Sequence, residues 1–140
     1  MFPELGEPRL SAGIDLVNVR RVAESLAQFG DRFLRRVFTE AEIAYATAAP
    51  ALTVERLAAR FAAKEATMKA LGLVESGVGW RQIEVTNQRS GGCRLRLHGA
   101  ALAAAREAGV TDLTVSLSHE GDYATAVVFA MRDRQEIAQS

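Results

Sequence analysis

The chain has 140 residues, of which 49% are hydrophobic, and its 17 basic and 17 acidic residues give a formal net charge of zero. This length and apolar content fit one globular domain, and the balanced charge argues against nucleic-acid binding through an overall positive field. The single cysteine, Cys93, excludes an intrachain disulfide.

The start of the chain does not have the pattern of a targeting segment. It lacks the basic and apolar regions of a signal peptide, and no apolar run in the sequence reaches the length of a membrane span. We therefore expect a cytoplasmic protein that does not bind membranes. We also expect a flexible extension over residues 1–9, one domain over residues 10–130 and a fraying polar tail over residues 131–140.

The first elements are marked by local signals. Residues 10–17 alternate as a strand that carries Asp15 on one face. Asn18 is a suitable N-cap for a helix that we expect to end at Gly30. A second short helix or turn follows around residues 33–37.

Thr39 and Glu42 have the spacing of a capping box and predict the start of another helix. A long helix is then expected over residues 53–71, ending at Gly72. The later segments, in chain order, are a hairpin over residues 81–97, an Ala-rich helix over 99–108, and strands over 113–118 and 123–130. Helices and hairpins that mix without regular alternation indicate the α+β class, with an antiparallel sheet packed against the long helix.

The long helix contains both lysines of the chain, Lys64 and Lys69, whereas the other fifteen basic residues are arginine. Glu65 falls in the middle of the apolar stripe of this helix, and the two lysines flank it. A carboxylate on a core-facing stripe is costly unless a cation meets it, which indicates a functional site. The simpler interpretation is a Glu65–Lys69 pair at i,i+4, which stabilises a helix by about 0.2–0.5 kcal/mol.

Asp15 and Glu65 would converge if the first strand packs against the long helix. Two carboxylates suit magnesium, which keeps water or substrate phosphates as its other ligands. The same pair could serve as the acid and base of a glycosidase, but the neighbouring lysines favour an anionic substrate. Asp15 could also simply cap a turn at the end of its strand.

Ser118 and His119 end a later strand, within the run Ser116-Leu117-Ser118-His119. Hydroxyl and imidazole groups there can bind phosphate or ribose, although a lone histidine is more often a hydrogen-bonded structural residue. We find no acidic partner at a spacing that would support a Ser-His hydrolase.

Five arginines within seventeen residues form a basic cluster, opposed only by Glu24 and Asp31. The cluster is either a solvated helix face or a docking surface for an acidic partner, and nucleic acid is the weaker candidate. Its members are Arg20, Arg21, Arg32, Arg35 and Arg36.

Taken together, five stretches resemble the holo-acyl-carrier-protein synthase family of 4′-phosphopantetheinyl transferases. They run in family order from residue 13 to about residue 129. The motif that is specific to the family is Arg60-Phe61-Ala62-Ala63-Lys64-Glu65-Ala66. The stretches are Gly13–Val17 with Val19–Arg21, Phe38–Glu40, Arg60–Ala66 with Lys69–Gly72, Trp80 with Ile83–Val85, and Ser116–His119 with Tyr123–Ala124.

The resemblance implies the fold of that family and a magnesium-dependent reaction in lipid metabolism. Phosphopantetheine would pass from coenzyme A to a serine of an apo acyl carrier protein, with release of 3′,5′-ADP. The resemblance also implies a homotrimer with sites between subunits, and fatty-acid biosynthesis as the setting.

The family pattern also implies residue roles. Asp15 and Glu65 would hold magnesium, and Lys69 would contact phosphate and stabilise developing charge. Glu65 is the candidate base for the serine, although the resemblance leaves this role open. The cofactor-binding residues would be Arg60, Lys64, Ser118 and His119. Lys64 could instead orient Glu65 or face the subunit boundary. The acidic carrier protein would dock on Arg20, Arg21 and Arg35.

The sequence departs from the family at the hairpin turn, where Gly91-Gly92-Cys93 replaces the frequent Gly-x-Pro. This departure leaves the effect of Cys93 on nucleotide contacts open, and residues 1–9 have no counterpart. A non-catalytic coenzyme A or nucleotide sensor, and a structural trimer assembled through the arginine cluster, are the alternative functions. The sequence does not say whether the carrier protein belongs to fatty-acid, polyketide or peptide synthesis, or which acyl forms of coenzyme A are accepted.

Overall fold

The computed structural model describes residues 5–6 and 8–133 of the chain. In chain order its elements are β1 (Leu10–Asn18), α1 (Val19–Phe29), α2 (Asp31–Val37), α3 (Glu40–Thr47), the 3₁₀ turn η1 (Pro50–Leu52), α4 (Thr53–Leu71), the 3₁₀ turn η2 (Trp80–Gln82), β2 (Ile83–Asn87), β3 (Cys93–Leu97), α5 (Gly99–Glu107), β4 (Val110–Glu120) and β5 (Tyr123–Arg132). Most of the predicted N-terminal extension and C-terminal tail lies outside the described residues. None of the helices in the described part is long and apolar enough to cross a membrane.

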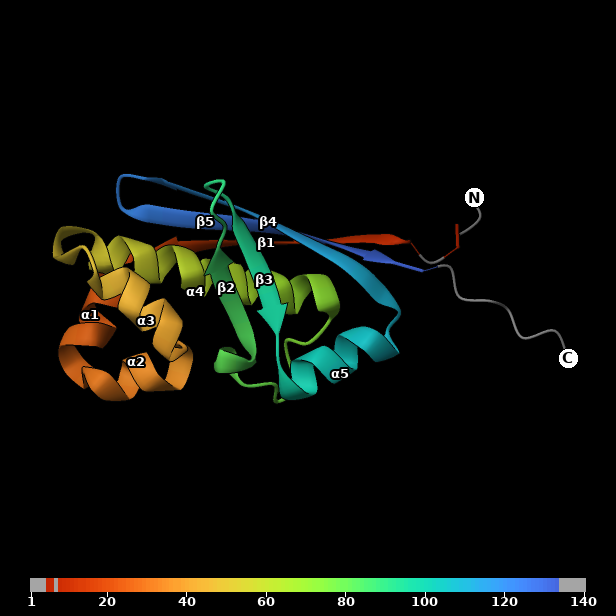
Figure 1. The fold of residues 1–140 in the computed structure, drawn as a ribbon, viewed down its shortest axis with the longest axis horizontal. Coiled ribbons are helices and arrows are strands. Elements are labelled where there is room, and N and C mark those ends of the chain that lie inside the picture. The colour runs from red at the N-terminus through yellow and green to blue at the C-terminus, as the bar shows by residue number, and fades with distance from the viewer. Residues whose placement is uncertain (1–4, 7, 134–140) are drawn as a thin grey trace, which may run out of the picture.

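Two antiparallel sheets surround the long helix α4. One has the strand order β1-β5-β4, and the other is the β2-β3 hairpin. In Figure 1, α4 runs along the three-stranded sheet, helices α1, α2 and α3 gather at one end, and α5 lies beside the base of the hairpin. This arrangement confirms the predicted α+β class with an antiparallel sheet on a long helix.

Local sequence signals define the predicted element boundaries. The Asn18 side chain accepts a hydrogen bond from the backbone of Arg20 and caps α1. Both hydrogen bonds of the capping box at Thr39 and Glu42 are present, and α4 ends at Gly72 in the left-handed conformation, as predicted. Strand β4 runs two residues beyond its predicted end at residue 118 and includes His119 and Glu120.

Strand β1 packs very closely against α4. A Cβ atom added to Gly13 would lie 1.9 Å from the carbonyl oxygen of Ala66, so only glycine permits this approach. The Ser11 hydroxyl donates to the carbonyl of Ala70 at 2.7 Å, close to the same crossing. The small residues of α4 therefore bring the backbone near Asp15 to the surface of the helix.

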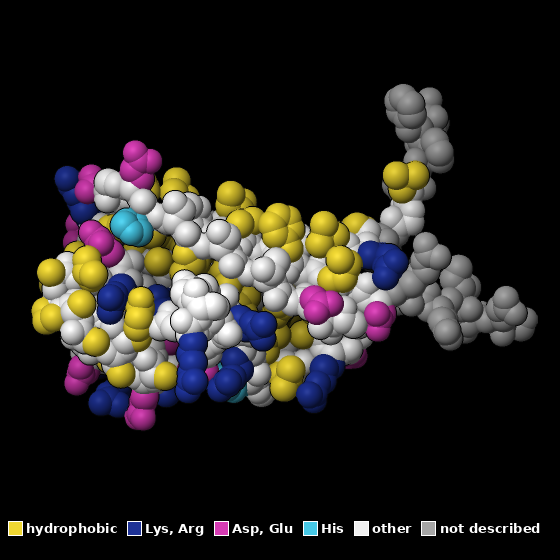
Figure 2. Space-filling view, turned by 45° about the horizontal axis from the view of Figure 1, so that its top comes forward, with side chains coloured by type: hydrophobic (Ala, Val, Ile, Leu, Met, Phe, Trp, Pro, Cys, Tyr) yellow, Lys and Arg dark blue, Asp and Glu magenta, His cyan; other side chains and the backbone are white. Residues whose placement is uncertain are grey.

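The three-stranded sheet has two contrasting faces. One face covers α4 with buried residues such as Ala126 and Val128. The opposite face exposes large hydrophobic side chains, which Figure 2 shows along the upper part of the molecule. These side chains are Leu10, Ile14, Leu16, Tyr123, Phe129 and Met131, with exposed fractions from 38% to 66%.

Candidate active site

Asp15, Glu65 and Lys69 lie together where β1 crosses α4. The Lys69 ammonium donates to the carbonyl oxygen of Ile14 at 2.9 Å and to Oδ1 of Asp15 at 3.1 Å. The Asp15 side chain is only 12% exposed, whereas that of Lys69 is 47% exposed. The lysine is therefore anchored at the site while part of its charge faces solvent.

The Glu65 carboxyl is held in an unfavourable electrostatic environment. Burial raises its pKa above the ordinary value, and the negative charge and hydrogen bond of Asp15 raise it further, while Lys69 opposes the shift. Two carboxyls that share a site resist double ionisation, so a bound cation would favour the fully ionised pair.

The carboxylate pair fits magnesium better than it fits a metal held by protein ligands alone. Within residues 5–6 and 8–133, no group of three or more His, Cys, Asp or Glu side chains could hold a metal ion. Magnesium commonly takes one or two carboxylates and completes its shell with water and substrate phosphate. Asp15 and Glu65 are the residues that could hold it.

The position of Glu65 on α4 differs from the prediction. The helix is buried on most of its surface, and the line of Phe61, Glu65 and Lys69 is one of its more open sides. Glu65 therefore does not point into the core. It lines a cavity of about 440 Å³ together with Asp15 and Arg21.

Lys64, predicted to contact the cofactor or to orient Glu65, is turned into the interior of the protein, away from both cavities. Its side chain has no exposed surface, and its ammonium donates to Glu42 Oε1 at 2.7 Å. Burial lowers the pKa of Lys64, and the charge of Glu42 opposes that shift. The sequence missed this because Glu42 lies 22 residues upstream, on another helix.

Arg60 lies at a second cavity, of about 330 Å³, which Ser118 and His119 also line. Its Nη2 donates to Asn87 Oδ1 at 2.8 Å, and its guanidinium lies 4.1 Å from the centre of the Tyr45 ring. Burial lowers the pKa of Arg60. Three of the four residues predicted to bind the cofactor thus meet at one cavity.

Three residues of this second cavity or its support were missed by the sequence analysis. The Arg56 guanidinium also lies over the Tyr45 ring, 4.2 Å from its centre, and Asn87 accepts the hydrogen bond of Arg60. The i,i+4 spacing of Arg56 and Arg60 on α4 was a signal that could have found Arg56. Nothing in the local sequence indicates the contacts of Tyr45 and Asn87.

The arginines predicted to dock a partner are in three different settings. Arg21 lines the same cavity as Asp15 and Glu65. Arg20 lies 3.6 Å from Asp122 in an exposed ion pair. Arg35, on α2, lines a separate shallow cavity, so only Arg21 adjoins the carboxylate site.

Comparison with known proteins relates this geometry to one family. A family model described as the 4′-phosphopantetheinyl transferase superfamily matches residues 11–128. The chain is 45% identical over 129 residues to a holo-[acyl-carrier-protein] synthase of Herpetosiphon aurantiacus, an alignment that covers 87% of this chain and 98% of the relative.

Solved structures show the same similarity. An ACPS–CoA complex described as from Chronobacterium ammoniagenes superposes with a TM-score of 0.80 at 34% identity, covering 89% of this chain and 98% of that one. The holo-[acyl-carrier-protein] synthase of Helicobacter pylori in complex with coenzyme A has a TM-score of 0.74 at 25% identity, covering 85% and 98%.

Proposed function

This chain belongs to the 4′-phosphopantetheinyl transferase superfamily, and we propose that it is a holo-[acyl-carrier-protein] synthase. It transfers 4′-phosphopantetheine from coenzyme A to a serine of an apo acyl carrier protein and releases 3′,5′-ADP. The observation that carries the proposal is the meeting of Asp15 and Glu65 at one cavity, with Lys69 bonded to Asp15 beside it. We also propose the cytoplasm and fatty-acid biosynthesis as the setting.

The carboxylate site suits the pyrophosphate end of the reaction. Asp15 and Glu65 would hold magnesium, which when bound supplies positive charge to the phosphate oxygens as the bond breaks. The half-exposed ammonium of Lys69 adds a fixed positive charge beside them. Ionised Glu65 is the candidate base for the serine hydroxyl, and its raised pKa brings it closer to the range in which a base is effective.

The second cavity suits the nucleotide end of coenzyme A. Arg60 supplies a guanidinium, and Ser118 and His119 supply a hydroxyl and an imidazole from the end of β4. Such groups bind phosphate and ribose oxygens. Arg56 lines the same cavity and adds a second guanidinium.

The surface near the carboxylate site suits an acidic protein partner. Arg21 adjoins the cavity of Asp15 and Glu65, and Arg20 and Arg35 lie on α1 and α2 of the same end of the molecule. Positive charges around a site steer an acidic partner toward it. We assign these arginines to carrier-protein docking.

The protein would act as a homotrimer with sites between subunits. Support comes from the exposed apolar face of the three-stranded sheet, because soluble monomers seldom leave a large apolar patch uncovered. The two cavities also share no lining residue, so a complete site can draw the carboxylates from one subunit and the nucleotide residues from another.

The test is to incubate the protein with coenzyme A, magnesium and several apo carrier proteins and to weigh the carriers by mass spectrometry. We expect a phosphopantetheine mass gain, a loss of at least about 100-fold in rate for Glu65→Gln and Asp15→Asn, and little change for Glu75→Gln, an exposed loop control. No mass gain on any carrier would refute the transferase. Binding of coenzyme A without any mass gain would instead favour the sensor.

A further inference from the structure

Lys64 and Glu42 form an ion pair in the centre of the molecule, away from both cavities. Both side chains have no exposed surface, and Nζ lies 2.7 Å from Oε1. A buried ion pair is weak evidence for stability, because well-packed hydrophobic residues often replace such a pair without loss. The role of the pair therefore depends on what else its two side chains hold in place.

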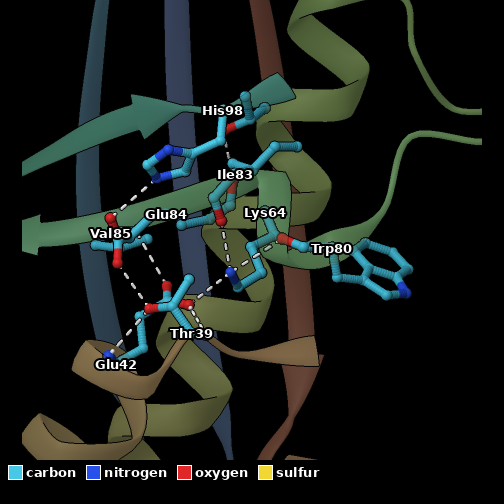
Figure 3. Close-up of polar contacts among 10 residues, drawn as sticks. Thr39, Glu42, Lys64, Trp80, Ile83, Glu84, Val85 and His98 are labelled. Carbon is cyan, nitrogen blue, oxygen red and sulfur yellow. Dashed lines mark hydrogen bonds and ion pairs between the residues drawn. The ribbon is translucent and has the colours of Figure 1, made fainter. Parts of the chain in front are cut away.

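The pair is completely hydrogen-bonded to several separate segments, as Figure 3 shows. Besides Glu42, the Lys64 ammonium donates to the carbonyl oxygens of Trp80 at 3.1 Å and of Ile83. All three ammonium protons thus have acceptors. These acceptors come from α3, η2 and β2, so one side chain of α4 is tied to three neighbouring segments.

The Glu42 carboxylate is fixed in the same way. Its Oε1 also accepts from the backbone of Thr39 at 2.9 Å, and its Oε2 accepts from the backbone of Val85 at 3.0 Å. Each partner of the ion pair is therefore held in one position by backbone groups. A satisfied buried network of this kind specifies geometry more strictly than apolar packing does.

The consequence falls on the next residue of the helix. Successive residues of an α-helix point about 100° apart, so Lys64 faces α3 and β2 while Glu65 turns toward Asp15 of β1. Arg60 has a separate anchor in Asn87. The bonds of Lys64 thus restrict the rotation of α4 one residue before Glu65.

We propose that Lys64 and Glu42 are positioning residues of the transferase: their ion pair fixes the rotation of α4 so that Glu65 meets Asp15. This inference rests on the proposed function, because it assigns the pair to the geometry of that site. A misplacement of about 1 Å in an active site can cost about 100-fold in rate. Loss of the pair therefore slows the reaction even in a molecule that stays folded.

The test is the double variant Glu42→Leu with Lys64→Met, which replaces the pair by apolar side chains of similar size. We expect a folded protein by circular dichroism, a kcat at least 10-fold below wild type and a KM for coenzyme A within three-fold of wild type, because Arg60 keeps its own anchor. The matched control is Thr67→Val, a buried change on α4 whose hydroxyl bonds only within the helix. It should keep its kcat.

A folded double variant with wild-type kcat would overturn the inference, and so would equal losses in kcat and in coenzyme A binding, which indicate general loosening. If the double variant does not fold, Glu42→Asp tests the inference instead. Its shorter side chain changes the position of the carboxylate that Lys64 binds, so the inference requires a lower kcat. Crystal structures of wild type and variant show the orientation of Glu65 independently of any activity measurement. A wild type that transfers nothing refutes the proposed function, and the structures still test the positioning.

Discussion

At the scale of single residues, Glu65 is where burial and charge conflict most. Burial raises its pKa above 4.5, and Asp15 raises it further. Because the pKa is higher in the folded chain, proton binding at Glu65 stabilises the fold fully below about pH 4.5, and this contribution is lost as the pH rises through the raised value. At neutral pH the ionised Glu65 carboxyl lowers the stability of the metal-free fold, as expected at a site that binds a cation.

The first prediction concerns this pKa. In the metal-free protein, Asp15→Asn should lower the pKa of Glu65, because it removes the nearby negative charge. The measurement is a carbon-13 NMR titration of the Glu65 carboxyl, with Asp112→Asn, an exposed change on β4, as control. An unchanged or higher Glu65 pKa in Asp15→Asn would show that the two carboxyls do not interact.

The same residue predicts the acid limb of the activity. Glu65 acts only when ionised, and bound magnesium favours the ionised form, so the pH at which the transfer rate of wild type falls on acidification should be lower at saturating than at limiting magnesium. An acid limb at the same pH at both magnesium concentrations would contradict a role for ionised Glu65 at the magnesium site.

At the scale of elements, the sequence predicts what short-range chemistry determines. Helix α4 begins and ends as expected because its apolar pattern and the terminal Gly72 are local signals. The convergence of Asp15 and Glu65 also follows once β1 packs on α4, and Gly13 is the residue that permits this contact. These features can be predicted from residues that are close in the sequence and from one assumed contact, that of β1 with α4.

Features that depend on distant partners were not predicted. The burial of Lys64 depends on Glu42 and on backbone carbonyls at Trp80 and Ile83. Sequence periodicity predicts which side of a helix is buried from the residues of that helix alone. Helix α4, however, is covered by a sheet on one side and by α3 and β2 on another. The open side that carries Glu65 is therefore a property of the assembled fold.

Helix α1 carries the third prediction. Arg21→Glu reverses a charge at the rim of the carboxylate cavity, so we expect the KM for an acidic carrier protein to rise about 10-fold or more while the KM for coenzyme A changes little. The effect should weaken at high salt. The control is Arg106→Glu, the same change of charge on α5 at the other end of the molecule (Figure 1). Equal changes in both KM values would argue against docking on α1.

At the scale of the whole molecule, the three-stranded sheet is covered on one side only. Its inner face packs on α4, whereas Phe129 and Ile14 on the outer face are 38% and 66% exposed. With a net charge of zero, long-range repulsion does not keep copies of the chain apart. The apolar face, the charge balance and the separate cavities together favour a symmetric assembly that buries the sheet.

The last prediction tests that assembly through Phe129, which lies on the central strand between Ala12 and Thr114. We expect wild type to have the mass of three chains by light scattering, and Phe129→Lys to have the mass of one, because a buried unpaired ammonium is strongly unfavourable at an apolar interface. The variant should keep its circular dichroism but lose transfer activity, since the carboxylate and nucleotide halves of each site separate. Val74→Lys, which adds the same charge at an exposed loop position, should stay trimeric and active. A monomeric wild type, or a fully active monomeric variant, would contradict sites shared between subunits.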